Sequence, residues 1–219
     1  MDKFSTLTTG AVALEADNID TDQIMPKQFL RGIDKAGLDK GLFYNLKHKA
    51  DGSLNPDCVL NSSAAAKAAV LVAGPNFGCG SSREHAVWGL LQGGFRVVVA
   101  PSFGEIFYSN CFNNGLLACK ITADDSKKLF AVLRADPEAS FTVNLATRTI
   151  RTGDAVVSFE IAPRHSRMLE LGLDMVDATL SEIDEVKRFR ESHERDFPWM
   201  SGLPGKAKRV LIARGESLP

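Results

Sequence analysis

Short apolar runs alternate with segments of helical apolar spacing through the middle of the chain. The runs AAVLVA (68–73), FRVVVA (95–100) and LLACKI (116–121) are typical of buried strands. Between them, REHAVWGLLQGG (83–94) and residues 103–114 predict helices, each ended by glycine. A strand–helix–strand–helix–strand order predicts an α/β fold in which neighbouring strands pair in parallel.

The second half of the chain predicts helices and one hairpin. Residues 140–161 alternate apolar and polar positions around a turn at 152–154, which adds an antiparallel part to the sheet. We therefore expect a mixed sheet with a parallel core and flanking helices. The helices expected here cover 124–135, with Asp124 or Asp125 as the N-cap, 163–171 and 181–195.

The N-terminal part has less periodicity. After a short strand at 11–14, residues 17–57 are rich in polar and turn-forming residues and predict a long loop, which is usually functional or mobile. Asp17, Asp20 and Asp22 fit either turn-capping acids or a metal site. Their spacing does not continue into a calcium-binding loop, which favours capping.

Composition then narrows the class of protein. The 219 residues are 44% hydrophobic and 24% charged, with 26 basic and 27 acidic side chains, so a disordered chain is excluded. Without a basic excess, neither nucleic acid nor an anionic membrane is an expected partner. No apolar stretch suits a membrane helix or a secretion signal, and the four cysteines form no CxxC pair. We expect a reduced, cytoplasmic protein without a metal site of its own.

The segment from Gly74 to His85 carries the most chemical information. It leaves a predicted strand and enters a predicted helix, which is where α/β proteins bind ligands. Gly78 and Gly80 allow a sharp turn, while Arg83 and the helix N-terminus favour a small anion. Neither the phosphate-loop pattern nor the dinucleotide pattern is complete, so a carboxylate fits as well as a phosphate.

The same segment also has purely structural interpretations. Ser81 and Glu84 have the spacing of a capping box, in which Ser81 would only cap the helix. A Ser81–His85 pair or a Cys79 thiolate at the helix N-terminus would instead support catalysis. Spacing alone leaves these possibilities open and favours capping.

Two longer motifs carry a resemblance. FGCGSSREHA (77–86), followed by GGFRVVVAPSFGEIFYSNCFNNGLL (93–117), closely resembles the small subunits of 3-isopropylmalate dehydratase, in the aconitase superfamily. DNIDTDQIMPKQFLRG (17–32) resembles the opening motif of the same family. The resemblance covers about residues 1–200 and implies the aconitase-type swivelling β/β/α domain. We expect one domain over 1–200 and a C-terminal extension over 201–219.

The resemblance also implies a reaction and a partner. The family interconverts 2-isopropylmalate and 3-isopropylmalate in leucine biosynthesis, and its 4Fe–4S cluster lies on a separate large subunit, so no cofactor is expected on this chain. By resemblance, Ser81 is the base at carbon, while Ser82 and Arg83 hold the substrate. Phe29 and Leu30 would face the isopropyl group and Arg31 a carboxylate.

Two alternatives remain open at this stage. The chain could serve a related hydro-lyase acting on citraconate, dimethylmalate or a homoaconitate-like acid. It could also be a stand-alone module that binds small dicarboxylates, with Ser81 only capping a helix.

Overall fold

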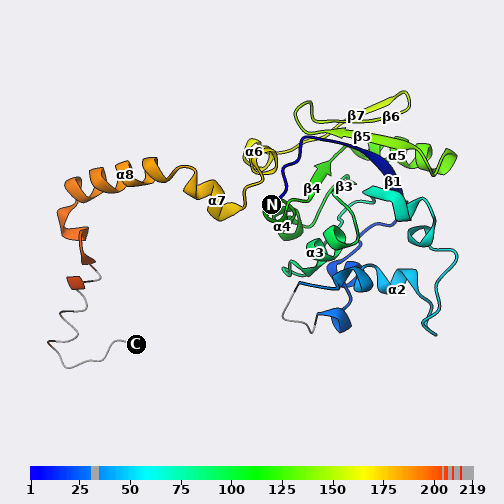
Figure 1. The fold of residues 1–219 in the computed structure, drawn as a ribbon, viewed down its shortest axis with the longest axis horizontal. Coiled ribbons are helices and arrows are strands. Elements are labelled where there is room, and N and C mark those ends of the chain that lie inside the picture. Colours follow the sequence, from blue (N-terminus) through cyan, green and yellow to red (C-terminus); the bar gives the residue numbers. More distant parts are fainter. Residues whose placement is uncertain (31–34, 204, 207–208, 210–212, 214–219) are drawn as a thin grey trace. The chain divides into compact units, whose positions relative to one another are not determined.

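Seven strands form one mixed sheet in the order β4-β3-β2-β1-β5-β6-β7 (Figure 1). The computed structural model describes residues 1–30, 35–203, 205–206, 209 and 213. The strands are β1 (Thr6–Leu14), β2 (Ala68–Ala73), β3 (Val97–Ala100), β4 (Leu117–Lys120), β5 (Ser140–Asn144), β6 (Thr149–Thr152) and β7 (Ala155–Ser158).

Strand β1 joins a parallel half of the sheet to an antiparallel half. It pairs in parallel with β2 and antiparallel with β5, so Gly10 lies between Ala68 and Ser140. Strands β3 and β4 continue the parallel half, whereas β5, β6 and β7 form an antiparallel meander. The expected hairpin turn lies between β6 and β7, but the earlier turn between β5 and β6 was not predicted. The predicted α/β fold, a mixed sheet with a parallel core, is confirmed.

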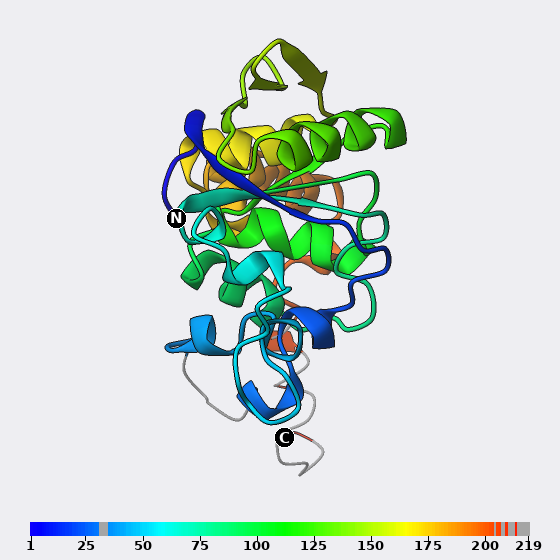
Figure 2. The same cartoon turned by 90° about the vertical axis from the view of Figure 1, so that its right-hand side faces the viewer.

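Helices cover both faces of the parallel strands. Successive strand residues point to opposite faces, and Val70, Leu71 and Val72 are all fully buried. Helix α5 (Ala123–Ala135) lies on one side of the strands, with α3 (His85–Gln92) and α4 (Glu105–Asn114) on the other (Figure 2). These helices, and α6 (Pro163–Leu171), match the predicted ones closely.

Helix α5 begins differently from the prediction. Its N-cap is Thr122, whose hydroxyl accepts the Asp125 backbone N–H at 3.1 Å, so the prediction of Asp124 or Asp125 as the cap is wrong. Asp124 and Asp125 lie instead in the first turn, where a negative charge is favourable near the positive end of the helix dipole. Threonine and aspartate are both common N-cap residues, so the sequence pattern did not distinguish Thr122 from the two aspartates and misplaced the start of the helix.

The polar segment between β1 and β2 contains short helical turns, whereas the sequence predicted only a loop for residues 17–57. These turns fold over buried anchors such as Ile24, Met25 and Phe43, which are at most 1% exposed. Single turns of this kind leave too few apolar repeats for a periodic pattern. They are α1 (Thr21–Ile24), η1 (Lys27–Phe29), η2 (Leu38–Gly41), α2 (Tyr44–Lys47), η3 (Val59–Asn61) and η4 (Ala65–Lys67).

The chain divides into two compact units, residues 1–175 and 176–219. Helix α7 (Met175–Leu180) was not predicted; α8 (Ile183–Asp196) follows it as expected, and η5 (Pro198–Met200) comes after α8. A domain boundary at residue 200 remains a prediction. In the described part of the chain, none of the helices combines the length and apolar character needed to cross a bilayer.

The four cysteines fall into two environments. Cys111 on α4 and Cys119 on β4 are fully buried in the core, and burial raises the pKa of both thiols well above the usual value. Cys58 and Cys79 are partly exposed. The thiolate is the reactive form of cysteine. Cys111 and Cys119 are therefore protected from reagents in two ways: burial blocks access to them, and the raised pKa keeps them protonated.

We predict that a thiol reagent at pH 8 modifies two of the four cysteines of the folded chain quickly. Cys58 and Cys79 should react, whereas Cys111 and Cys119 should react only after denaturation. Titration with a chromogenic disulfide, followed by mass spectrometry of peptides, checks both the number and the positions. Fast labelling of Cys111 would contradict the placement of α4 on the sheet.

Candidate active site

The loop between β2 and α3 lies at the carboxyl end of the parallel strands and is fastened on two sides. On one side, the Gly78 N–H donates to Ile19 O at 2.7 Å and the Thr21 N–H to Cys79 O at 2.9 Å. On the other side, the Phe77 N–H donates to Ser102 O at 3.1 Å. Backbone bonds therefore bring the two motifs of the sequence together, although about 60 residues separate them.

Glycines are required where this loop meets α4. Gly78 has φ +74°, and a Cβ there would lie 2.2 Å from Cγ of the Phe107 ring. Gly104, the N-cap of α4, also approaches closely, because a Cβ there would lie 2.6 Å from Gly78 O. Gly80 also has a positive φ, +103°, but more space, with the nearest atom 3.6 Å from a Cβ. The loop thus passes between α1 and α4 with no room for side chains at its tightest point.

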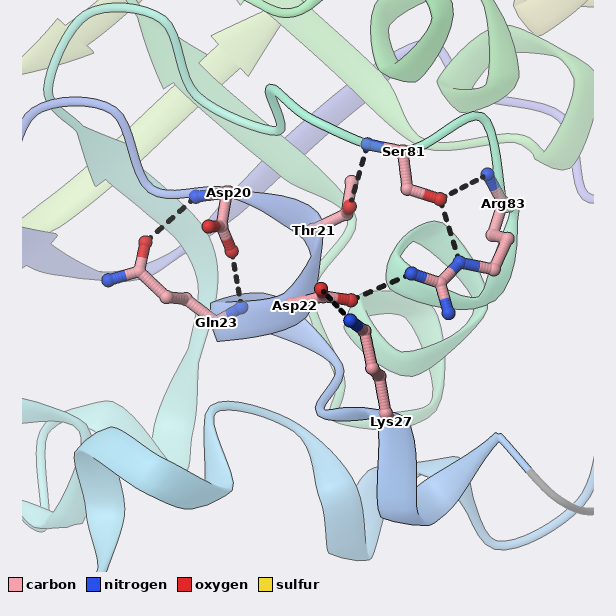
Figure 3. A network of polar contacts seen from close by, with 7 residues as sticks. All are labelled: Asp20, Thr21, Asp22, Gln23, Lys27, Ser81 and Arg83. Atoms are coloured by element: carbon pink, nitrogen blue, oxygen red, sulfur yellow. Dashed lines mark hydrogen bonds and ion pairs between the residues drawn. The ribbon is translucent and has the colours of Figure 1, made fainter.

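Arg83 holds the hydroxyl oxygen of Ser81 with two donors (Figure 3). Its Nε donates to Ser81 Oγ at 2.7 Å, and its backbone N–H donates to the same oxygen at 3.2 Å. Both side chains are only partly buried. A cationic donor at this distance stabilises negative charge on the oxygen, so the arrangement favours deprotonation of Ser81.

Asp22 holds the other end of the same guanidinium. Arg83 Nη2 donates to Asp22 Oδ1 at 2.7 Å, and Lys27 Nζ lies 3.4 Å from Asp22 Oδ2 (Figure 3). This carboxylate orients Arg83 toward Ser81 and also joins the start of η1 to the site. The sequence reasoning missed this role, since it assigned Asp22 only to turn capping or to a metal.

The turn that carries Asp22 is itself capped. Asp20 Oδ1 accepts the Gln23 N–H at 2.7 Å, and Gln23 Oε1 accepts the Asp20 N–H at 2.9 Å, so this capping box begins α1. The prediction of a capping acid is confirmed for Asp20. Between these residues Thr21, which is 5% exposed, accepts the Ser81 N–H on its Oγ1 at 3.1 Å.

The predicted capping role of Ser81 is wrong. Helix α3 begins at His85, its N-cap is Glu84, and neither a side-chain cap nor a Ser81–Glu84 capping box is present. Ser81 lies outside the helix, and its oxygen accepts hydrogen bonds from Arg83. This frees it for chemistry, and it removes the physical objection that capping and catalysis compete for one oxygen.

The other candidate residues in this loop make contacts that do not involve Ser81 Oγ. The His85 ring packs against Trp88, with centroids 4.7 Å apart, and the donors to Ser81 Oγ in the described residues both come from Arg83. Cys79 Sγ lies 3.6 Å from Asn18 O. The Ser82 side chain is exposed beside Arg83, where a ligand can reach it.

The predicted substrate-recognition segment is only partly described. Phe29 packs on Tyr44, with ring centroids 5.1 Å apart, and its Cγ would lie 2.6 Å from a Cβ at Gly41. Leu30 is half-buried at the end of η1, and Arg31 lies outside the described residues. Part of the Phe29 ring is therefore committed to packing. The contact of Lys27 with Asp22 joins the segment to the Ser81 loop.

Donor groups suited to an iron–sulfur cluster do not come together in the described residues. No group of three or more His, Cys, Asp or Glu side chains there could hold a metal ion. Cys111 and Cys119 are buried, and the pKa of each thiol is raised, which opposes the thiolate form that ligates iron. The described part of the chain does not fit such a cluster.

Comparison with known proteins identifies the class first. A family model described as "Aconitase C-terminal domain" matches residues 1–124, more than half of the chain, and a model named LeuD_N matches residues 127–163. The chain belongs to the aconitase C-terminal domain family, within which it groups with the small subunits of 3-isopropylmalate dehydratase. The resemblance stated from the sequence is thereby confirmed.

Individual relatives support this assignment. The 3-isopropylmalate dehydratase small subunit 1 of Chromobacterium violaceum is 48% identical over 92% of this chain and 95% of its own length. The corresponding small subunit of Azorhizobium caulinodans is 45% identical over 91% of this chain and its whole length. A crystal structure of 3-isopropylmalate dehydratase from Methanocaldococcus jannaschii matches with a TM-score of 0.60 at 24% identity, over 84% of this chain and 99% of that one, which shows the same fold.

We predict that Gly78→Ala destabilises the chain more than Gly80→Ala. Both substitutions strain a left-handed backbone by about 1–3 kcal/mol. Only Gly78→Ala also forces a Cβ into the Phe107 ring, which adds about 1–3 kcal/mol of overpacking. Urea denaturation of both variants measures the difference. Equal free energies of unfolding would show that the loop does not pass this close to α4.

Proposed function

We propose that this chain supplies one side of the active site of a 3-isopropylmalate dehydratase, a hydro-lyase of leucine biosynthesis. The enzyme would interconvert 2-isopropylmalate and 3-isopropylmalate through isopropylmaleate. The observation that carries the proposal is the position of Ser81 Oγ, 2.7 Å from Arg83 Nε and outside helix α3. Family membership supports the reaction, and this geometry supports the role of the residues.

Ser81 is proposed as the base that moves a proton at carbon. A serine hydroxyl is a weak acid, so its alkoxide needs donors and positive charge close by. Arg83 provides both, with its side-chain Nε and its backbone N–H on the same oxygen. The alkoxide would take the proton from C3 of 2-isopropylmalate and return a proton to C2 on rehydration. Each complete turnover regenerates the Ser81 side chain, and the water released by dehydration is matched by the water added on rehydration.

Arg83 is also proposed to bind a substrate carboxylate. A guanidinium has five N–H donors in one plane, and Ser81 and Asp22 engage two of its nitrogens on one side. Nη1 takes part in neither of these two bonds, and it would donate to the substrate carboxylate. The exposed hydroxyl of Ser82 would add a further bond.

The segment after Lys27 is proposed to recognise the rest of the substrate. Leu30, with the exposed edge of Phe29, would contact the isopropyl group, and Arg31 would meet the second carboxylate. Its connection to the base is the Lys27–Asp22–Arg83 chain of contacts. Apolar residues here favour an alkyl substituent over the carboxyethyl group of homoaconitate-like acids.

The remaining chemistry is proposed to come from a partner. The described residues lack ligands for an iron–sulfur cluster, so a large subunit would carry the 4Fe–4S cluster and assist departure of the hydroxyl group. The small-subunit names of the relatives agree with a two-chain enzyme. We place the complex in the cytoplasm, where its dicarboxylate substrate would be made and used.

We predict that Ser81→Ala lowers kcat by about 100- to 10,000-fold in the two-subunit enzyme, because the base at carbon is removed. Ser109→Ala, an exposed serine on α4, is the matched control and should retain full activity. The measurement is the ultraviolet absorbance of the unsaturated intermediate during turnover. Near-normal activity of Ser81→Ala, with its fold intact by circular dichroism, would reject Ser81 as the base.

Asp22→Asn should lower kcat by about 100-fold, since a neutral amide no longer holds Arg83 toward Ser81 and misplacement of catalytic groups is costly. Lys27→Ala removes the other partner of the same carboxylate but leaves the Arg83 contact, and it should cost much less. Steady-state kinetics of both variants tests this. Equal losses in the two variants would contradict the assignment.

The isolated chain should have no dehydratase activity and should regain it when mixed with an iron-containing large subunit. Co-purification from the native host, followed by iron analysis and turnover assays, tests the partner directly. Full turnover by the chain alone would overturn the half-site proposal. Micromolar binding of isopropylmalate by the chain alone, measured by calorimetry, would favour the stand-alone binding module instead.

A further inference from the structure

Asn110, on α4, contacts the loop between β2 and α3 that carries Ser81, called the catalytic loop below. Its side-chain Nδ2, on α4, donates to the backbone carbonyl oxygen of Ser82 at 3.3 Å. That carbonyl belongs to the peptide group linking Ser82 to Arg83. The N–H of the same group is the Arg83 N–H that donates to Ser81 Oγ at 3.2 Å.

A planar peptide group couples its two ends. Because the group is rigid and trans, holding the direction of its C=O also sets the direction of its N–H. Asn110 therefore aims the Arg83 N–H at Ser81 Oγ without touching that oxygen. A donor on the carbonyl also polarises the amide, which strengthens the N–H as a donor through hydrogen-bond cooperativity.

Asn110 stands on an anchored part of α4. One turn later, Asn114 Nδ2 donates to Asn110 O at 2.9 Å, and Asn114 Oδ1 accepts the Trp88 Nε1–H at 2.9 Å. Trp88 belongs to α3, the helix that the catalytic loop enters. Bonds from α4 thus reach the loop at Ser82 and the following helix at Trp88, so α3, α4 and the loop are fastened as one piece.

We propose that Asn110 is a positioning residue for the reaction, orienting the Ser82–Arg83 peptide so that its N–H stabilises the Ser81 alkoxide. This inference rests on the proposed role of Ser81 as the base. Arg83 Nε stabilises the same alkoxide through charge, and the peptide N–H adds a second donor from another direction. Because the Asn110 side chain donates to the Ser82 carbonyl, it would act on the base and not on substrate binding.

The test uses the complete two-subunit enzyme with Asn110→Ala and Asn110→Asp. We expect kcat to fall about 10-fold in Asn110→Ala, with KM unchanged, since a hydrogen bond that supports a charged group is weakened. The kcat of Asn110→Asp should fall further, because a carboxylate cannot donate a hydrogen bond and repels the Ser82 carbonyl oxygen. In both variants the alkoxide is less stable, so the rise of kcat with pH should move to higher pH. Ser109→Ala, on the same helix, should leave both quantities unchanged.

The outcomes distinguish the role of Asn110 from the proposed role of Ser81 as the base. If Ser81→Ala is inactive but Asn110→Ala keeps the normal kcat and pH profile, the role of Asn110 is rejected while that of Ser81 stands. A lower kcat and a higher KM with an unshifted pH profile would also reject the role of Asn110, because a general loosening of the loop would give this pattern. If Ser81→Ala remains active, the proposed base fails first. If Asn110→Ala does not fold, Asn110→Asp, close in size to the original, decides by the same pH profile.

Discussion

The arrangement of the site depends on one guanidinium shared between two loops. Arg83 bonds Ser81 on its own loop and Asp22 on the turn after β1, each at 2.7 Å. Charge and geometry act together here, since a planar cation with several donors can fix an acceptor on each side. Without that cation, Ser81 would be an ordinary hydroxyl on a partly exposed loop, and the two motifs would be joined by backbone and Thr21 hydrogen bonds but not through a shared charge.

The sheet makes this sharing possible. Strands β1 and β2 are parallel neighbours, so the segments that follow them leave from the same edge. The capped turn at Asp20 then directs Asp22 toward the loop, and Gly78 lets the loop pass beneath Phe107. Helix α4 closes the arrangement from the other side through Asn110.

Much of the fold could be predicted because its signals are local. The run AAVLVA reads as a buried strand since both faces of β2 are covered, and glycine ends α4 at residue 115 with φ +82°. The single turns between β1 and β2 were missed, because one turn buries one or two side chains and leaves no repeat. The start of α5 was misplaced since Thr122, Asp124 and Asp125 all suit the same cap, and only the backbone path selects one of them.

The sequence by itself determined the α/β class and Arg83 as an anion-binding candidate, because residue types and spacing near one strand end carry those signals. Ser81 and Ser82 became candidates through the family resemblance of the two motifs. Tertiary structure alone decided that Ser81 caps no helix, that Asp22 orients Arg83, and that Asn110 reaches the Ser82 carbonyl. The physical reason is separation along the chain: Asp22 and Arg83 are 61 residues apart, and Asn110 and Ser82 are 28 apart. Contacts over such distances exist only once the parallel strands have brought their carboxyl ends together.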